Sequence, residues 1–305
     1  MRHFIDLADW SGSDIMALIR QSVELKAEWK RGGNRPILAG QTLGMLFQKP
    51  SLRTRVSFDV AAYQLGGYSI MLAPNEVDMG KRESVADVAR VISGYVQAVM
   101  LRVFDHRQLL EFARHSTVPV INGLSDQHHP CQALADMLTI YEKFGKIQGL
   151  KIAFVGDGNN VAASLLLASA QLGARFAIAT PPGYELSQEV YQQAVTLAAG
   201  SSTLIESFSD PQRAVRDADV IYTDTWVSMG QEAEAAQRAD RFKPYQVNDA
   251  LVALANPNAV VMHCLPAHRG EEITDSVADG KQSVIFQQAH NRLHAQKAIL
   301  AKLMA

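Results

Sequence analysis

The chain has 305 residues, of which 48% are hydrophobic and 20% charged, and its formal net charge is −2. This length exceeds the usual size of one domain and is enough for two packed cores. Because the sequence has no basic run and no interleaving of basic and aromatic residues, we expect no nucleic-acid surface, and any anion site must be local.

Short β-rich runs alternate with helical periodicity along the first half of the chain, which predicts a parallel α/β domain. These strands are predicted at residues 43–47, 68–72, 98–101 and 118–121. The alternation restarts after Gly145 and Gly149, which predicts a second parallel sheet. Its strands are predicted at 151–155, 176–179, 203–205, 220–223, 260–262 and 284–286, followed by a last helix over about 288–304.

Right-handed crossovers bring the carboxyl ends of parallel strands to one edge of each sheet, where ligands bind. We therefore expect an active site between the two domains. Within the second domain, Asp210-Pro211 and Asn248 are typical helix starts, and Gly173 is a typical helix end.

The pentapeptide Ser51-Leu52-Arg53-Thr54-Arg55 follows the first predicted strand and opens a helix. Hydroxyl and guanidinium groups at a helix start join free backbone N–H donors and the positive end of the helix dipole, and together they favour a bound anion such as phosphate. An N-capping hydroxyl beside solvated arginines explains the same residues, so both interpretations stay open on this motif alone.

Other polar residues stand where strands end or helices begin. Arg102 follows a strand, which fits either a cleft cation or a surface arginine, and His129 and Gln132 flank Pro130 at a helix start. Asp224 also follows a strand, where a carboxylate suits an ammonium group or caps a loop.

The run 155–160 has the start of a dinucleotide-binding fingerprint, but Val161 occupies the place of its third glycine. No acidic residue ends the next strand to bind a ribose. The dinucleotide interpretation is therefore weak.

Four motifs stand in the order and approximate spacing of one enzyme family: His129-Pro130-Cys131-Gln132, residues 224–230, His263-Cys264-Leu265-Pro266 and Asn291-Arg292. On these residues, and over essentially its whole length, the chain resembles the aspartate/ornithine carbamoyltransferase family. The Ser228-Met229-Gly230 loop and the His-Cys-Leu-Pro motif resemble its ornithine branch.

The resemblance implies two parallel-sheet α/β domains, the second Rossmann-like, with an interdomain active site. It implies that residues 1–145 bind carbamoyl phosphate and residues 149–286 bind ornithine, while a C-terminal helix over about 287–305 packs back on the first domain. It further implies a homotrimer or a higher assembly of trimers, with carbamoyl phosphate and L-ornithine as partners and without a metal or redox cofactor.

Residue roles follow from the same resemblance, position by position. The catalytic residues are Arg102, His129 and Cys264. Carbamoyl phosphate is bound by Ser51, Leu52, Arg53, Thr54, Arg102, His129, Gln132, Cys264, Leu265 and Arg292, and ornithine by Asn160, Asp224, Ser228 and Met229. Arg55 fits a ligand contact or a buried ion pair equally well, and His128 is assigned a structural role.

The expected reaction is attack of the neutral δ-amine of ornithine on carbamoyl phosphate. A covalent role for Cys264 is not favoured, since phosphate is already a good leaving group and ornithine brings its own nucleophile. Asp224, Cys264, a water or the phosphate remain alternatives as proton acceptor. A cis peptide at Leu265-Pro266 is supported by the resemblance but is not visible in sequence.

Three other functions remain as alternatives. One is a carbamoyltransferase for putrescine or N-acetylornithine, another is an NAD-dependent dehydrogenase, and the third is a carbamoyl-phosphate-binding protein without activity. Asp78, Gln287 and His290 depart from the usual family pattern. The departure at Asp78 puts a contact of this position with carbamoyl phosphate across a subunit interface in doubt.

Cys131 and Cys264 are the only cysteines, and both stand in apolar settings, which favours a reducing compartment over a disulfide framework. The first six residues lack the apolar core of a signal peptide, and no apolar run approaches the roughly 20 residues that cross a bilayer. We expect a soluble protein of the cytoplasm with no membrane partner.

Overall fold

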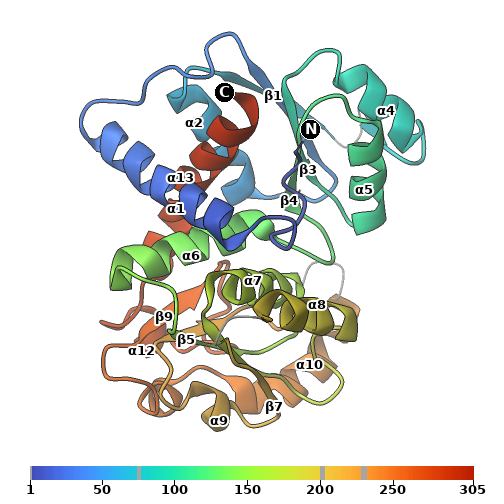
Figure 1. Cartoon of the computed structure of the whole chain (residues 1–305). Helices are drawn as coiled ribbons and strands as arrows, with labels where there is room; N and C mark the ends of the chain where they lie inside the picture. Colours follow the sequence, from blue (N-terminus) through green and yellow to red (C-terminus); the bar gives the residue numbers. More distant parts are fainter. Residues whose placement is uncertain (1, 74–76, 200–202, 228–231) are drawn as a thin grey trace. The chain divides into compact units, whose positions relative to one another are not determined.

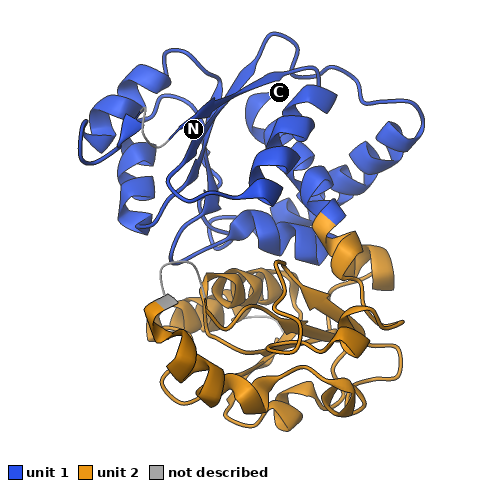
Figure 2. Ribbon diagram, turned by 180° about the vertical axis from the view of Figure 1, so that it is seen from behind, with its two compact units in different colours: residues 1–138, 290–305 blue, residues 139–289 orange. Residues whose placement is uncertain are grey.

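The computed structural model describes residues 2–73, 77–199, 203–227 and 232–305. The chain forms two compact units, one of Met1–Leu138 with His290–Ala305 and the other of Thr139–Ala289 (Figure 2). Unit 1 therefore consists of two separate stretches of sequence, and the whole of unit 2 lies between them along the chain.

Unit 1 is built on a four-stranded parallel sheet in the order β2-β1-β3-β4. Its strands are β1 Thr42–Phe47, β2 Tyr68–Leu72, β3 Ala98–Arg102 and β4 Val120–Leu124. Strands β1, β3 and β4 are almost entirely buried, which explains their nearly unbroken apolar sequence. The first three strands confirm the prediction.

The fourth strand starts two residues later than predicted, at Val120 instead of residue 118. The side chain of Ser116 explains the shift, because its Oγ donates to Val118 O and accepts from Val118 N. A local side-chain turn thus takes the backbone groups that a strand would use.

Helices cover both faces of this sheet, with α4 and α5 on one side and α1, α2 and α13 on the other (Figure 1). The helices that belong wholly or partly to unit 1 are α1 Gly12–Lys30, α2 Leu52–Gln64, α4 Val85–Ile92, α5 His106–His115, α6 Pro130–Phe144 and α13 Ile285–Met304. The core under α4 and α5 contains Val88, Leu109 and Phe112 together with the strand residues Val99 and Leu101. These contacts fix the position of β3, which ends at Arg102.

Unit 2 is built on a five-stranded parallel sheet in the order β7-β6-β5-β8-β9. Its strands are β5 Lys151–Val155, β6 Arg175–Ala179, β7 Ile205–Phe208, β8 Val220–Thr223 and β9 Val260–His263. The strand order reverses beside β5, so the loops after β5 and β8 lie at a topological switch point, the usual ligand position in such sheets.

The helices of unit 2 lie on both faces of its sheet, with α7 and α8 on the face opposite α9 (Figure 1). They are α7 Asn160–Leu172, α8 Gln188–Ala198, α9 Pro211–Val215, α10 Ala235–Phe242, α11 Asp249–Val252 and α12 Asp275–Ala278, with short 3₁₀ turns η1 Glu232–Glu234 and η2 Lys243–Tyr245. Asp210 and Asn248 cap α9 and α11, and Gly173 ends α7 with φ of 72°, so these three helix signals are confirmed.

The predicted strand at 284–286 is wrong, because α13 begins at Ile285. Val284 N donates to Val261 O at 3.0 Å, and the next turn closes by Gln288 N donating to Val284 O at 2.8 Å. The chain therefore makes a single β-bridge beside β9 and then begins helix α13. Burial in this position, which both a strand and a helix satisfy, accounts for the apolar Val284-Ile285 pair.

Candidate active site

The first group of predicted site residues lies at the start of α2. Ser51 is the N-cap, and its Oγ accepts from Thr54 N at 3.4 Å while donating to Thr54 Oγ1 at 3.1 Å. The first N–H groups of a helix have no partner within the helix, so this end can bind an anion. Leu52 is 75% exposed and Arg53 is half-buried. Arg55 is exposed, which contradicts the buried ion pair considered for it.

Arg292 on α13 connects this helix start to α6. Its Nη2 donates to Thr54 Oγ1 at 2.9 Å, and its Nη1 donates to Gln132 Oε1 at 2.9 Å. Gln132 Nε2 in turn donates to Asp136 Oδ1 at 2.8 Å. All four side chains are buried. The structure thus brings together Thr54, Gln132 and Arg292 from three separate parts of the sequence.

Arg102 and His129 add a second cation and an imidazole to unit 1. Both are buried, Arg102 at the end of β3 and His129 directly before α6. Burial, reinforced by the charges of Arg292 and Arg102, holds the pKa of His129 well below its ordinary value. The imidazole is therefore neutral at physiological pH and retains one N–H donor, which suits a carbonyl oxygen.

Cys131, two residues after His129, is also buried. Burial raises the pKa of Cys131 to about 12, and its Sγ donates to Asn122 O at 3.3 Å. A buried, protonated thiol behaves as a small apolar side chain.

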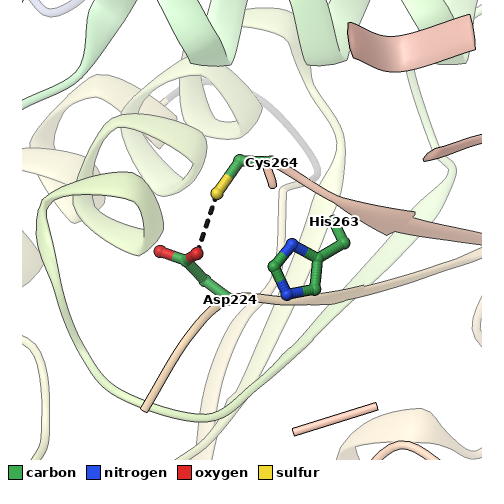
Figure 3. A group of neighbouring side chains, drawn as sticks. All are labelled: Asp224, His263 and Cys264. Atoms are coloured by element: carbon green, nitrogen blue, oxygen red, sulfur yellow. Dashed lines mark hydrogen bonds between the residues drawn. The ribbon is translucent and has the colours of Figure 1, made fainter. Parts of the chain in front are cut away.

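The second group of site residues gathers in unit 2 around Asp224, which follows β8. Its Oδ1 accepts from Cys264 Sγ and Thr225 N, both at 2.8 Å, and its Oδ2 accepts from Asn159 Nδ2 at 2.8 Å. Figure 3 shows the thiol of Cys264 pointing at this carboxylate, with the ring of His263 beside them. Cys264 is thus a hydrogen-bond donor to Asp224.

His263 orients the loop that carries Cys264. Its Nδ1 accepts from Leu265 N and its Nε2 donates to Glu272 Oε1, each at 2.9 Å, so the hydrogen bonds fix a neutral tautomer. Glu272 Oε1 also accepts from His268 N at 2.6 Å. The peptide bond Leu265-Pro266 is cis, and Leu265 has φ of 59°.

Asp224, His263 and Cys264 offer ligand atoms within 4.8 Å of one another, the spacing of a metal site. The imidazole nitrogens of His263, however, are both engaged by Leu265 and Glu272. A metal ion held by these three side chains would have to break that arrangement, which makes them a poor set of ligands.

The turn after β5 places Asn159 and Asn160. Asn159 caps α7, with its Oδ1 accepting from Val161 N and Ala162 N, and Asn160 is the first residue of that helix. A Cβ on Gly158 would lie 2.5 Å from backbone atoms of the 185–186 segment, so only glycine fits here. Ser228 and Met229 lie outside the described residues.

Sequence reasoning gave Asn159 only a supporting place and missed Asp136 and Arg238. The spacing of Gln132 and Asp136, four residues apart on one helix, was a signal that their side chains meet. No local pattern pointed to Arg238, which reaches Asp157 across 81 positions of sequence.

One parallel α/β unit thus carries buried cations beside a helix start, and the other carries a buried acid at a topological switch point. Residues 2–142 match the carbamoyl-P binding domain, and residues 148–303 the Asp/Orn binding domain, of aspartate/ornithine carbamoyltransferase. The chain belongs to the aspartate/ornithine carbamoyltransferase family.

Individual relatives agree with the family over almost the full length. An ornithine carbamoyltransferase of Anoxybacillus flavithermus is 52% identical over 303 residues, covering 99% of this chain and 96% of the relative. The structure of ornithine carbamoyltransferase from Pyrococcus furiosus has a TM-score of 0.97 at 52% identity, covering 99% of this chain and 97% of that one.

A more distant neighbour is a structure of acetylornithine transcarbamylase complexed with acetylcitrulline. It has a TM-score of 0.89 at 32% identity and covers 100% of both chains. Among the described residues of the present chain, no helix is both long and apolar enough to cross a membrane.

Proposed function

We propose that this chain transfers the carbamoyl group of carbamoyl phosphate to the δ-amine of L-ornithine, giving L-citrulline and phosphate. The observation that carries the proposal is the buried hydrogen-bonded set of Arg292, Thr54 and Gln132 at the start of α2. Relatives that are 52–53% identical in sequence over almost the full length are named ornithine carbamoyltransferase.

In this proposal residues 1–145 form the carbamoyl-phosphate domain, completed by the C-terminal helix over about 287–305. The phosphate binds the first turn of α2, through Ser51, the N–H of Leu52, Arg53 and Thr54. The carbamoyl group is bound by Arg102, His129, Gln132 and Arg292, and Arg102 and His129 donate hydrogen bonds to its oxygen. Donors already fixed by buried contacts stabilise charge that develops on an oxygen without having to reorganise.

Residues 149–286 form the ornithine domain. Asn160 and Met229 hold the α-carboxylate, and Asp224 and Ser228 hold the α-ammonium group. Cys264 and the backbone of Leu265 lie near the reacting amine and carbamoyl group. The buried carboxylate of Asp224 supports this assignment, because a cation compensates a buried anion.

The chemistry needs no metal or redox cofactor. The neutral δ-amine attacks the carbamoyl carbon, a C–N bond forms, and the C–O bond to phosphate breaks. The amine loses one proton over the reaction, and Asp224, Cys264, a water or the leaving phosphate is the acceptor. Rate enhancement then comes from alignment of the substrates and from stabilisation of the oxyanion and the leaving phosphate.

Citrulline formation from carbamoyl phosphate and ornithine tests the proposal, with putrescine, N-acetylornithine and aspartate as competing acceptors. Ornithine should be preferred strongly, since acetylation removes the ammonium charge that Asp224 would meet and putrescine lacks the carboxylate. A preference for any other acceptor would overturn the assignment.

We further propose a homotrimer, or an assembly of trimers, working in arginine biosynthesis in the cytoplasm. A relative from Pyrococcus furiosus is named an anabolic ornithine carbamoyltransferase. The edge strand β2 and helix α2 also expose several large apolar side chains, as surfaces covered by another subunit do. These are Leu52, Val56, Tyr63, Tyr68, Ile70 and Met71. Light scattering after size-exclusion chromatography tests the assembly.

A further inference from the structure

Arg238 on α10 is a buried guanidinium in unit 2 that belongs to none of the motifs described so far. It is 5% exposed. Its Nη1 donates to Asp157 Oδ2 at 2.9 Å and to Trp226 O at 3.0 Å. One nitrogen therefore bonds to two loops that are separate in sequence.

These two loops are the ones that carry the amino-acid site. Asp157 belongs to the turn after β5, just before Asn159 and Asn160, and Trp226 belongs to the loop after β8, two residues beyond Asp224. The hydrogen bond from Asn159 Nδ2 to Asp224 Oδ2 is a second link between the same loops. Arg238 and Asn159 thus connect the two loops at two points.

The guanidinium of Arg238 is itself held in place on several sides. Its carbon lies 4.8 Å from the centre of the Tyr184 ring and 5.9 Å from that of Phe242, and its Nε donates to Glu234 Oε2 at 3.0 Å. Stacking and a charge-assisted hydrogen bond fix a planar side chain more firmly than either does alone.

The bond also matters for the charge balance of the site. Asp157 and Asp224 are both buried, and the charge of Asp224 acts on Asp157. Two buried carboxylates near each other are unfavourable unless cations compensate them. Arg238 supplies one such cation, which leaves Asp224 available for the ammonium group of a substrate.

We propose that Arg238 is a positioning residue for the amino-acid substrate, holding the turn of Asn160 and the loop of Asp224 at a fixed spacing through Asp157 and Trp226. This inference rests on the proposed function. In it Arg238 does not touch ornithine, and its removal weakens ornithine binding because the two loops no longer hold their relative position.

The test compares Arg238→Ala and Arg238→Lys with Arg241→Ala, which removes an exposed arginine from the same helix and serves as matched control. The measurements are kcat, the KM values of both substrates, and the competitive inhibition constant of L-norvaline. Norvaline carries the amino-acid head of ornithine without the reactive amine, so it reports binding alone.

For Arg238→Ala we expect the KM of ornithine and the inhibition constant of norvaline to rise together by at least tenfold. The KM of carbamoyl phosphate and kcat at saturation should stay within about twofold. Arg238→Lys should fall between Arg238→Ala and the wild type, and Arg241→Ala should match the wild type.

An unchanged KM of ornithine in Arg238→Ala, or an equal rise in both KM values, would overturn the inference. If Arg238→Ala does not fold, the same comparison is made with Asp157→Asn, which keeps the shape of the acceptor and removes its charge. Absence of citrulline formation by the wild-type protein would instead contradict the proposed function, so the two failures are distinguishable.

Discussion

Arg292 shows how a single buried side chain organises the end of the site where we propose that phosphate binds. A guanidinium that donates to both Thr54 and Gln132 is fixed in a plane, and lysine cannot reproduce that fork. Its position on α13, far along the chain from both partners, gave no local sign of these contacts.

Replacing Arg292 by lysine should keep the positive charge but lose the two simultaneous hydrogen bonds to Thr54 and Gln132. A hydrogen bond to a charged group contributes about 1.5–3 kcal/mol, so kcat/KM for carbamoyl phosphate should fall by roughly 10- to 150-fold. Steady-state kinetics at saturating ornithine measures this. Lys302→Ala, an exposed change on the same helix, serves as control, and activity within twofold of wild type for Arg292→Lys would refute the role.

The pH dependence of ornithine binding should report on Asp157. Burial raises the pKa of Asp157 to about 6, against the attraction of Arg238, and Asp224 and Glu234 are the other charges acting on it. Below that pH the carboxyl becomes neutral and its bond to Arg238 weakens. The KM of ornithine for Asp157→Asn, divided by that of the wild type, should exceed one at pH 7.5 and approach one at pH 5.5.

A pH-rate comparison of the two proteins, each assayed with ornithine, measures this ratio. Changes in ornithine itself cancel, because both proteins meet the same substrate. A ratio that stays constant across this range would show that Asp157 does not control the loops through its charge.

The elements of the fold follow closely from local rules. Continuous apolar runs predicted most strands, although β7 spans Ile205–Phe208 where residues 203–205 were predicted, and Asp210, Asn248 and Gly173 marked helix ends as capping residues do. The failure at 284–286 has a physical cause, because a short apolar run between turns fits a buried strand and a buried helix start equally well. Periodicity alone does not separate them.

The turn after β5 offers a test at the scale of one element. In Gly158→Ala the new Cβ would meet the backbone of the 185–186 segment at 2.5 Å, so the turn or that segment must shift. Overpacking of this kind costs typically about 1–3 kcal/mol. The variant should melt at a lower temperature and show a raised KM for ornithine, with the KM of carbamoyl phosphate unchanged.

Calorimetry and steady-state kinetics measure the two effects. Gly94→Ala is a suitable control, because its φ is ordinary and the one close atom is the oxygen of Val91. Equal loss of affinity for both substrates would argue against a local effect on the ornithine side.

At the scale of the whole molecule, the buried Lys297 of α13 should make the stability of the protein depend on pH. Lys297 is 0% exposed, its Nζ donates to Asn34 Oδ1 at 2.6 Å, and it lies over the ring of Trp29. Burial lowers its pKa from 10.5 to about 8, although Glu28 opposes the shift. Nothing in the sequence distinguished this lysine from the surface lysines of other helices.

The sign of the stability effect follows from proton binding. Between pH 8 and 10.5 the unfolded chain holds the proton of Lys297 more tightly than the folded protein, so stability rises with pH in that range. The difference in unfolding free energy, wild type minus Lys297→Met, should grow by up to about 3 kcal/mol from pH 7 to pH 10.5. Chemical denaturation at both pH values measures it, and a constant difference would show that Lys297 stays charged.

Motifs predicted individual substrate-site residues, but they did not predict the contacts between them. Asp224 and Cys264 were predicted as separate contributors, and only the structure showed that the thiol donates to the carboxylate. Such contacts depend on how distant loops converge, which no local sequence rule contains.

The division of unit 1 into two stretches has a consequence for how the protein is made. Thr54 and Gln132 leave the ribosome long before Arg292, which is 238 positions beyond Thr54. During synthesis, therefore, the proposed phosphate site of unit 1 lacks Arg292 until the end of translation. Unit 2 is translated later than most of unit 1 but has its complete sequence first. Domains that fold as units during translation do so in the order in which they become complete. The half of the enzyme that begins the polypeptide is thus the half that matures last.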